Sequence, residues 1–191
     1  MILTEWGPAA AYRMLSPKWA TSPKSGAGAA LQGGRANRRG MPALYLALET
    51  QTAIREYQQA SSLLPPGTLV SYAVRLSRVA DYSAGYSSRD WDPLWEDFVC
   101  DWRELWFNHH IEPPSWVVAD QAVAAGAQGI LFRSQVAPPG LNLVVYTETL
   151  TKDDELSVSG DQEPRLFGGE DAVLAFIDAA SDGSVEVFQR V

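Results

Sequence analysis

The chain has 191 residues, 46% of them hydrophobic, and a formal net charge of -8 at pH 7. This length and apolar content predict one globular domain with a substantial core. No window of about 18 uncharged apolar residues occurs, which argues against a membrane span, and the single cysteine excludes an intrachain disulfide and fits a reducing cytoplasm.

The charges are divided unevenly along the chain. Residues 1–80 hold 9 Lys/Arg against 3 Asp/Glu, whereas residues 81–191 hold 6 against 20. A basic first part attracts a small polyanion, and an acidic remainder repels a long one. We therefore expect the arginines to bind a nucleotide-sized ligand and expect no direct contact with nucleic acid. The alternative is that both sets of charges are ordinary solvated surface.

Up to residue 150, five strands are predicted from alternating or short apolar runs. They cover residues 10–15, 43–48, 68–76, 130–134 and 142–147. The small, polar, glycine-rich residues 21–34 predict a loop. Strands and helices are mixed without a regular βαβ rhythm, which favours a compact α/β or α+β domain, with small mixed sheets flanked by helices, over a doubly wound sheet.

Three ordinary helices are predicted, one at residues 50–61, a short one that runs up to Ala125 with Ser115 or Asp120 as its cap, and one at 171–179. The first has Thr50 as its N-cap and carries Glu56 beside its packing side. That packing side consists of Ala53, Ile54 and Tyr57. The acidic stretch 151–163 predicts a loop, and a final strand is predicted at residues 185–188.

Residues 92–106 predict one strong helix with an aromatic face. Asp92 is its expected cap, with Pro93 at the first helical position. Large apolar side chains recur at spacings of three and four, namely Trp95, Phe98, Val99, Trp102, Leu105 and Trp106. Such a face is either core packing or a surface that holds a partner. His109 and His110 follow, but adjacent histidines point in different directions, so we expect no metal site.

The most informative stretch starts at the basic loop of residues 33–40. Three arginines stand in this glycine-flanked loop, the next strand carries Tyr45, and the following helix carries Glu56. This order brings a cationic loop, an aromatic side chain and a carboxylate within reach of one another. Such a site suits a ligand with phosphates at one end and a reacting sugar at the other.

Taken together, these segments resemble the RES domain family, which is named for an Arg, a Glu and a Ser. The resemblance covers roughly residues 10–148 and depends on the order and spacing of several short motifs. These are Tyr12-Arg13-Met14, Gly33-Gly34-Arg35 with Asn37 and Gly40, Leu44-Tyr45-Leu46-Ala47, Ala53 with Glu56, Gly129-Ile130 with Ser134, and Asn142-Leu143-Val144.

The resemblance implies a fold and an activity. RES domains are similar in fold to ADP-ribosyltransferases, occur as toxins of bacterial toxin–antitoxin pairs, and attack NAD. We therefore expect an α+β, ADP-ribosyltransferase-like fold and a cytoplasmic toxin that cleaves NAD at the nicotinamide–ribose bond and transfers ADP-ribose to a protein, as a mono-ADP-ribosyltransferase. Hydrolysis or phosphorolysis of NAD is the alternative. NAD would be a substrate, with no bound cofactor, and an Xre-like antitoxin would be the protein partner.

The resemblance also assigns the site. Glu56 and Ser134 would be catalytic, while Arg13, Arg35 and Tyr45 would bind NAD. Breaking the nicotinamide–ribose bond develops positive charge on the ribose, which the Glu56 carboxylate would stabilise while accepting the 2′-hydroxyl proton in a hydrogen bond. The arginines would hold the diphosphate with forked donors. Tyr45 would stack on nicotinamide or hold the ribose, and Ser134 would orient Glu56 or the nicotinamide amide.

Each of these residues also has an ordinary structural interpretation. An exposed helical glutamate is usually plain surface, surface arginines form weak salt bridges, and a strand tyrosine is ordinary core. The sequence also departs from the family at Ala36, where a tryptophan is usual. We expect this change to leave the basic loop more open and take it as a modest hint of an external acceptor.

The whole chain, residues 1–191, is expected to be a single RES-type domain. Two segments are extra to the family pattern: the tryptophan-rich helical segment at about 90–110 and an acidic C-terminal extension from about 150. The alternative to an enzyme is a binding module that holds a protein partner on the aromatic helix. That hypothesis predicts no NAD turnover and loss of the complex on substitution of Trp102 or Trp106.

Overall fold

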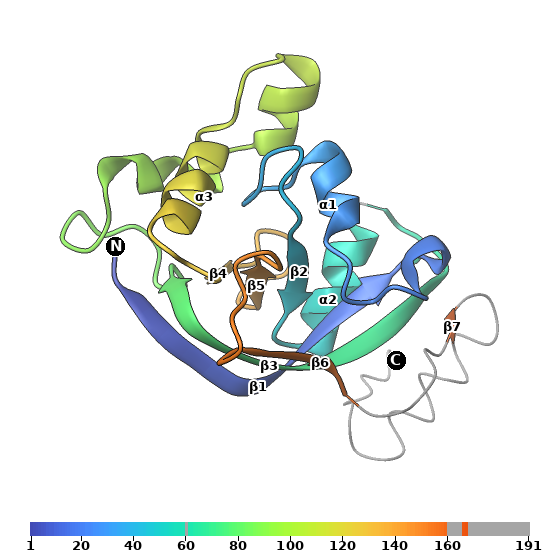
Figure 1. Cartoon of the computed structure of the whole chain (residues 1–191). Coiled ribbons are helices and arrows are strands. Elements are labelled where there is room, and N and C mark those ends of the chain that lie inside the picture. Colours follow the sequence, from blue (N-terminus) through green and yellow to red (C-terminus); the bar gives the residue numbers. More distant parts are fainter. Residues whose placement is uncertain (60, 160–165, 168–191) are drawn as a thin grey trace.

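The computed structural model describes residues 1–59, 61–159 and 166–167, and its strands form one sheet with helices packed around it (Figure 1). The strands are β1 (Leu3–Leu15), β2 (Leu44–Ala47), β3 (Gly67–Asp81), β4 (Gly129–Arg133), β5 (Leu141–Val145), β6 (Glu155–Val158) and β7 (Leu166–Phe167). The helices are α1 (Ala27–Gln32), α2 (Thr50–Gln58) and α3 (Pro114–Ala124), with short helical turns η1 (Pro17–Trp19), η2 (Pro93–Val99) and η3 (Glu104–Asn108).

The sheet closes on itself because β1 pairs at both of its edges. The strand order is β1-β2-β5-β4-β3, and β3 pairs again with β1, while β6 and β7 add to the other edge of β3. The pair Tyr12–Ala47 joins β1 to β2, and the pair Tyr12–Ser71 joins β1 to β3. Only β3 and β4 run parallel among these pairs of described strands. The architecture is α+β, as predicted, with the small sheets joined into one.

Two apolar clusters fill the molecule. The first lies between the strands and has Leu44, Tyr72 and Leu143 among its fully buried members. The second packs α3 and the aromatic residues 91–98 against β4 and β5. Its aromatic rings include edge-to-face pairs, as in the contact between Tyr82 and Trp91, whose centroids lie 5.2 Å apart. The second cluster therefore anchors the tryptophan-rich segment to the sheet.

The prediction of one continuous helix over residues 92–106 is wrong. The helical turn η2 ends at Val99, Cys100 is extended, and the π-type turn η3 begins at Glu104. The Arg35 guanidinium donates hydrogen bonds to the carbonyl oxygens of Phe98 and Cys100. In a continuous helix these oxygens would accept from the amides four residues later, so the contact with Arg35 replaces helical pairing. The expected cap and proline do hold, because Asp92 accepts the Leu94 amide at 3.0 Å.

The aromatic face predicted for that helix is mostly core. Trp95, Phe98 and Trp102 are buried, Trp106 is half-buried, and Val99 is exposed. The alternative of a partner surface on the tryptophans is therefore not favoured, because the side chains that would form it face the interior.

The remaining predicted strands, helices and loops differ from the structure mainly in where they begin and end. All five predicted strands form, and β1 and β3 are longer than predicted. The loop predicted at 21–34 contains the short helix α1. The N-cap of α2 is Glu49 rather than Thr50, and the acidic stretch predicted as a loop contains β6. The predicted helix at 171–179 and strand at 185–188 lie outside the described residues. In the ranges that the structure covers, no helix combines the length and apolar character needed to cross a membrane.

Candidate active site

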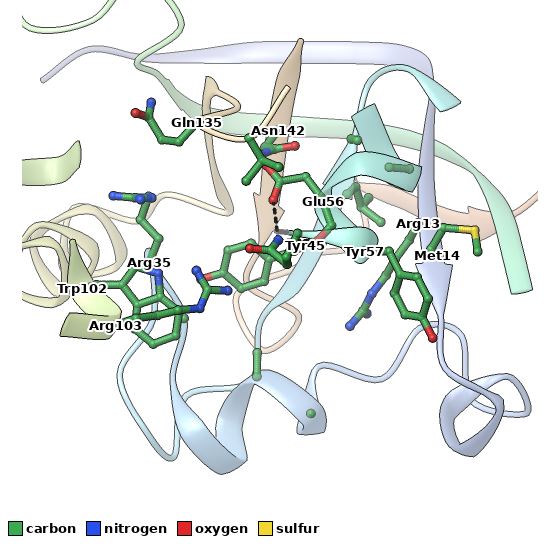
Figure 2. A pocket seen from close by; sticks show the side chains of 18 of the residues that line it. Arg13, Met14, Arg35, Tyr45, Glu56, Tyr57, Trp102, Arg103, Gln135 and Asn142 are labelled. Carbon is green, nitrogen blue, oxygen red and sulfur yellow. Dashed lines mark hydrogen bonds between the residues drawn. The ribbon is translucent and has the colours of Figure 1, made fainter. Parts of the chain in front are cut away.

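A cavity of about 430 Å³ opens between β1, β2, α1, α2 and the residues around Trp102. Four of the five predicted site residues line it, namely Arg13, Arg35, Tyr45 and Glu56. Figure 2 shows Arg35 and Arg13 at opposite sides of the cavity, with Tyr45 and Glu56 between them. The fifth, Ser134, does not line the cavity but touches Glu56 from behind.

The Glu56 carboxylate is held by two side chains at one oxygen. Its Oε1 accepts from Ser134 Oγ at 2.7 Å and from Asn142 Nδ2 at 2.5 Å. Its Oε2 accepts a longer hydrogen bond, 3.2 Å, from Gln59 Nε2. Because Oε1 is occupied twice, Oε2 is the oxygen with acceptor capacity left for a ligand. The predicted contact between Ser134 and Glu56 is therefore present.

Ser134 is fixed in the turn that follows β4. It is 1% exposed, and its Oγ accepts the backbone amides of Val136 at 3.2 Å and Ala137 at 2.8 Å. With two amides donating to it, the hydroxyl directs its own proton at Glu56. Ser134 is therefore suited to orienting the Glu56 carboxylate.

Asn142 belongs to one of the sequence motifs, but the sequence alone predicts no role for it in the site. It stands in β5 opposite Ala47 of β2 and Phe132 of β4, so its side chain reaches Glu56 from the middle of the sheet. It is only 7% exposed. The available signal was an amide in the strand sequence Leu141–Val145, which is otherwise apolar, since a buried amide needs a partner.

Tyr45 and Asn37 hold the basic loop in shape. The Tyr45 hydroxyl accepts the Ala36 amide and donates to Asn37 Oδ1, both at 2.8 Å. Asn37 is fully buried, and its Nδ2 donates to the carbonyls of Ala29, Arg38 and Met41. Burial raises the pKa of Tyr45 well above its usual range, so the phenol stays protonated.

Gly33 and Gly34 allow the loop to pass close to other groups. Gly33 has a positive φ of 84°, and a Cβ there would lie 2.5 Å from the Trp116 ring. Trp116 in turn donates its indole N–H to the Gly34 carbonyl at 2.7 Å. A side chain at position 33 is therefore excluded by both conformation and space.

Arg13 and Arg35, the two cavity arginines that the sequence predicts, keep donors available. Arg35 uses Nη1 for Phe98 and Cys100, and Arg13 makes a long hydrogen bond of 3.5 Å to the Ser25 carbonyl. Burial lowers the pKa of Arg13 and of Arg35, and the nearby positive charge of Arg103 contributes to lowering the pKa of Arg35. Within the described ranges, none of these three arginines forms an ion pair.

The other two arginines of the basic loop point elsewhere. Arg38 donates to both oxygens of Asp120, at 2.5 to 3.1 Å, and to Glu112 at 3.2 Å. These hydrogen bonds raise the pKa of Arg38 further above its usual value. Arg39 is exposed and donates to the Leu31 carbonyl. Of the three, only Arg35 faces the cavity.

The expected effect of Ala36 is wrong. Its side chain is fully buried, and its carbonyl accepts the Tyr146 hydroxyl at 2.9 Å. An alanine at this position packs into the core of the loop and does not open the loop to solvent. The hint of an external acceptor that depended on this opening therefore has no structural basis.

Three cavity residues, Trp102, Arg103 and Phe107, come from the tryptophan-rich segment, and the sequence predicts no place in the NAD site for them. Trp102 and Arg103 line the same cavity as Glu56, and the Arg103 guanidinium lies 4.6 Å from the centre of the Trp102 ring. The sequence gives only a weak signal, an arginine directly after a tryptophan, because the break in the helix that allows the stack is not visible in the helical periodicity. The histidines nearby lie apart from this cavity, and His109 pairs with Glu104 at 3.1 Å.

Comparison with known proteins gives one family and one fold. The family model for the RES domain matches residues 10–167. Among solved structures, the chain is similar to a chain in the crystal structure of the M. tuberculosis MbcT–MbcA toxin–antitoxin complex, with 22% sequence identity and a TM-score of 0.54. That match covers 83% of this chain and 84% of the other, and shows that the two chains share a fold, in agreement with the predicted α+β RES-type domain. No curated protein sequence matches the chain.

Proposed function

Because the chain belongs to the RES domain family, we propose that it is the toxin of a toxin–antitoxin pair and cleaves NAD at the nicotinamide–ribose bond. One observation supports this most directly: the Glu56 carboxylate, held by Ser134 and Asn142, faces a cavity that also contains Arg13 and Arg35. The solved neighbour comes from a toxin–antitoxin complex, which supports the toxin role and an antitoxin as partner. The Xre-like type of that antitoxin remains part of the proposal.

Glu56 would act on the ribose of NAD. Cleavage of the nicotinamide–ribose bond leaves positive charge on the sugar, and a fixed carboxylate stabilises that charge. Glu56 Oε2, which has acceptor capacity left, would accept a hydrogen bond from the ribose 2′-hydroxyl. That hydrogen bond strengthens as positive charge develops on the ribose. Ser134 and Asn142 would keep the carboxylate in position, so that little reorganisation is needed during the reaction.

Arg13 and Arg35 would hold the diphosphate. A guanidinium offers planar, paired donors that match phosphate oxygens. Both side chains line the cavity, and neither is paired with a carboxylate in the described part of the chain. Tyr45 lies between them and would contact the nicotinamide or its ribose.

The ADP-ribose is proposed to pass to a protein side chain, as in a mono-ADP-ribosyltransferase. Transfer to water or phosphate, which would deplete NAD, is the second candidate. It is favoured by the same unpaired guanidinium groups, because they could hold a free phosphate next to the reacting ribose.

The first test is nicotinamide release from NAD by the wild-type protein and by Glu56→Gln. We expect the variant to lose at least about 100-fold in rate, because it keeps the shape and loses the charge that stabilises the transition state. Glu5→Gln, an exposed strand residue outside the cavity, is the matched control and should retain full activity. Normal release by folded Glu56→Gln, checked by circular dichroism, would rule out the role of Glu56.

The second test separates the acceptors. The protein is added to a cell lysate with NAD labelled in its adenine, and the label is followed. Label that precipitates with protein supports ADP-ribosyl transfer, whereas label that stays in solution as ADP-ribose or its phosphate supports NAD degradation.

A further inference from the structure

Trp102 and Arg103 form a stacked pair on the cavity wall opposite Arg13 (Figure 2). Trp102 is 6% exposed, and its ring is supported by Phe107, whose centroid lies 6.0 Å away. Arg103 is exposed and lies over the Trp102 ring at 4.6 Å. The pair is therefore a buried aromatic base with a planar cation on top of it.

The backbone just before this pair is fixed by the basic loop. Arg35 Nη1 donates to the carbonyls of Phe98 at 3.1 Å and Cys100 at 2.7 Å, where the helical turn η2 ends at Val99, three residues before Trp102. No described carboxylate pairs with Arg103. Its outer face is therefore available to a flat ligand group, since guanidinium planes and aromatic rings both stack on nucleic acid bases.

The charges decide which ring of NAD this wall can accept. The nicotinamide ring of NAD is a cation, and two guanidinium groups, those of Arg35 and Arg103, would repel it. The adenine ring is neutral and carries no such penalty. The nicotinamide is better placed beside the Glu56 carboxylate, in the middle of the cavity, where its bond to ribose would break.

We infer that Arg103, supported by Trp102, forms a subsite for the adenine ring of the substrate, with the purine as the third layer of the stack. This inference rests on the proposed function, because it assigns one half of the NAD molecule to one wall of that same cavity. It also gives the tryptophan-rich segment a role in selecting an adenine nucleotide.

The test compares equilibrium binding of adenosine 5′-monophosphate and ribose 5-phosphate by calorimetry. The two probes share a phosphate and a sugar, and only the first has a purine. Stacking on an aromatic or guanidinium platform is expected to make the wild-type protein bind the purine probe about 5- to 100-fold more tightly. Arg103→Ala should remove most of this preference, and Arg103→Lys should not restore it, because lysine keeps the charge and lacks the plane.

Arg39→Ala removes an exposed arginine outside this cavity and is the control, with the preference unchanged. Equal binding of the two probes by the wild type, or full recovery of the preference in Arg103→Lys, would overturn the subsite. Nicotinamide release by the wild-type protein is measured separately. A preference for the purine probe without any NAD cleavage would contradict the proposed function and leave the subsite standing.

Discussion

At the scale of single residues, the site depends on side chains that orient other side chains. Ser134 and Asn142 hold Glu56, while Tyr45 and Asn37 hold the backbone on either side of the Arg35 loop. The motif residues expected to act on NAD were readable from the sequence. The sequence assigns no role to Asn142, because an amide in an apolar strand indicates a buried partner, whereas the identity of that partner depends on the pairing of β5 with β2 and β4.

Ser134→Ala tests the orienting role. The change leaves Glu56 with Asn142 alone and leaves two backbone amides without their acceptor, which costs about 1–3 kcal/mol of folding stability. We expect kcat for NAD cleavage to fall at least about tenfold with KM little changed, because the carboxylate is less well positioned. Initial rates and urea denaturation measure the two effects. Ser88→Ala, at an exposed position, is the control, and an unchanged kcat in Ser134→Ala would contradict the orienting role.

At the scale of elements, the basic loop is shared between the cavity and α3. Arg35 faces the cavity and ends the helical turn η2, whereas Arg38 binds Asp120 of α3 and Glu112. The sequence predicted the existence of the main strands and helices well. The prediction of a continuous aromatic helix is wrong, because helical periodicity does not reveal that the Phe98 carbonyl accepts a hydrogen bond from a guanidinium 63 residues away.

The division of the loop predicts different effects for two arginines. Arg35→Gln should raise the KM for NAD at least about tenfold, because it removes a charged contact to the diphosphate and loosens the wall that carries Trp102. Arg38→Gln should leave KM within about twofold and lower stability by about 1 kcal/mol or less, because its ion pairs are half-exposed. Steady-state kinetics and thermal denaturation measure both. Equal effects on KM would show that the loop binds NAD as one cationic surface.

At the scale of the whole molecule, several phenols are enclosed in the closed sheet and its clusters. Tyr72 is fully buried and donates to the Pro23 carbonyl at 2.7 Å. Burial raises its pKa to about 12, with Arg13 opposing this shift, and burial also raises the pKa of Tyr146. The sequence marked both tyrosines as strand residues, but the depth of their burial follows only from sheet closure, which no single segment encodes.

These phenols predict a loss of stability in alkali. Tyr72 ionises near pH 10 in the unfolded chain and near pH 12 in the folded one, so its contribution is complete below about pH 10 and is lost as the pH rises toward 12. The free energy of unfolding should fall by up to about 1.4 kcal/mol per pH unit for each such group. Urea denaturation at several values between pH 9 and 11.5 measures the slope, and Tyr72→Phe should make it shallower. A flat profile would contradict this prediction.

The double pairing of β1 has a consequence for how the protein loses activity. Tyr12 pairs with β2 on one side and β3 on the other, and the next residue, Arg13, lines the cavity. Separation of β1 from its two neighbours would open the ring of strands and withdraw Arg13, a proposed diphosphate ligand, in a single event. Local unfolding of this strand would therefore remove the proposed activity before the whole protein unfolded. A partner that binds β1 would stabilise the form of the protein in which the cavity is intact.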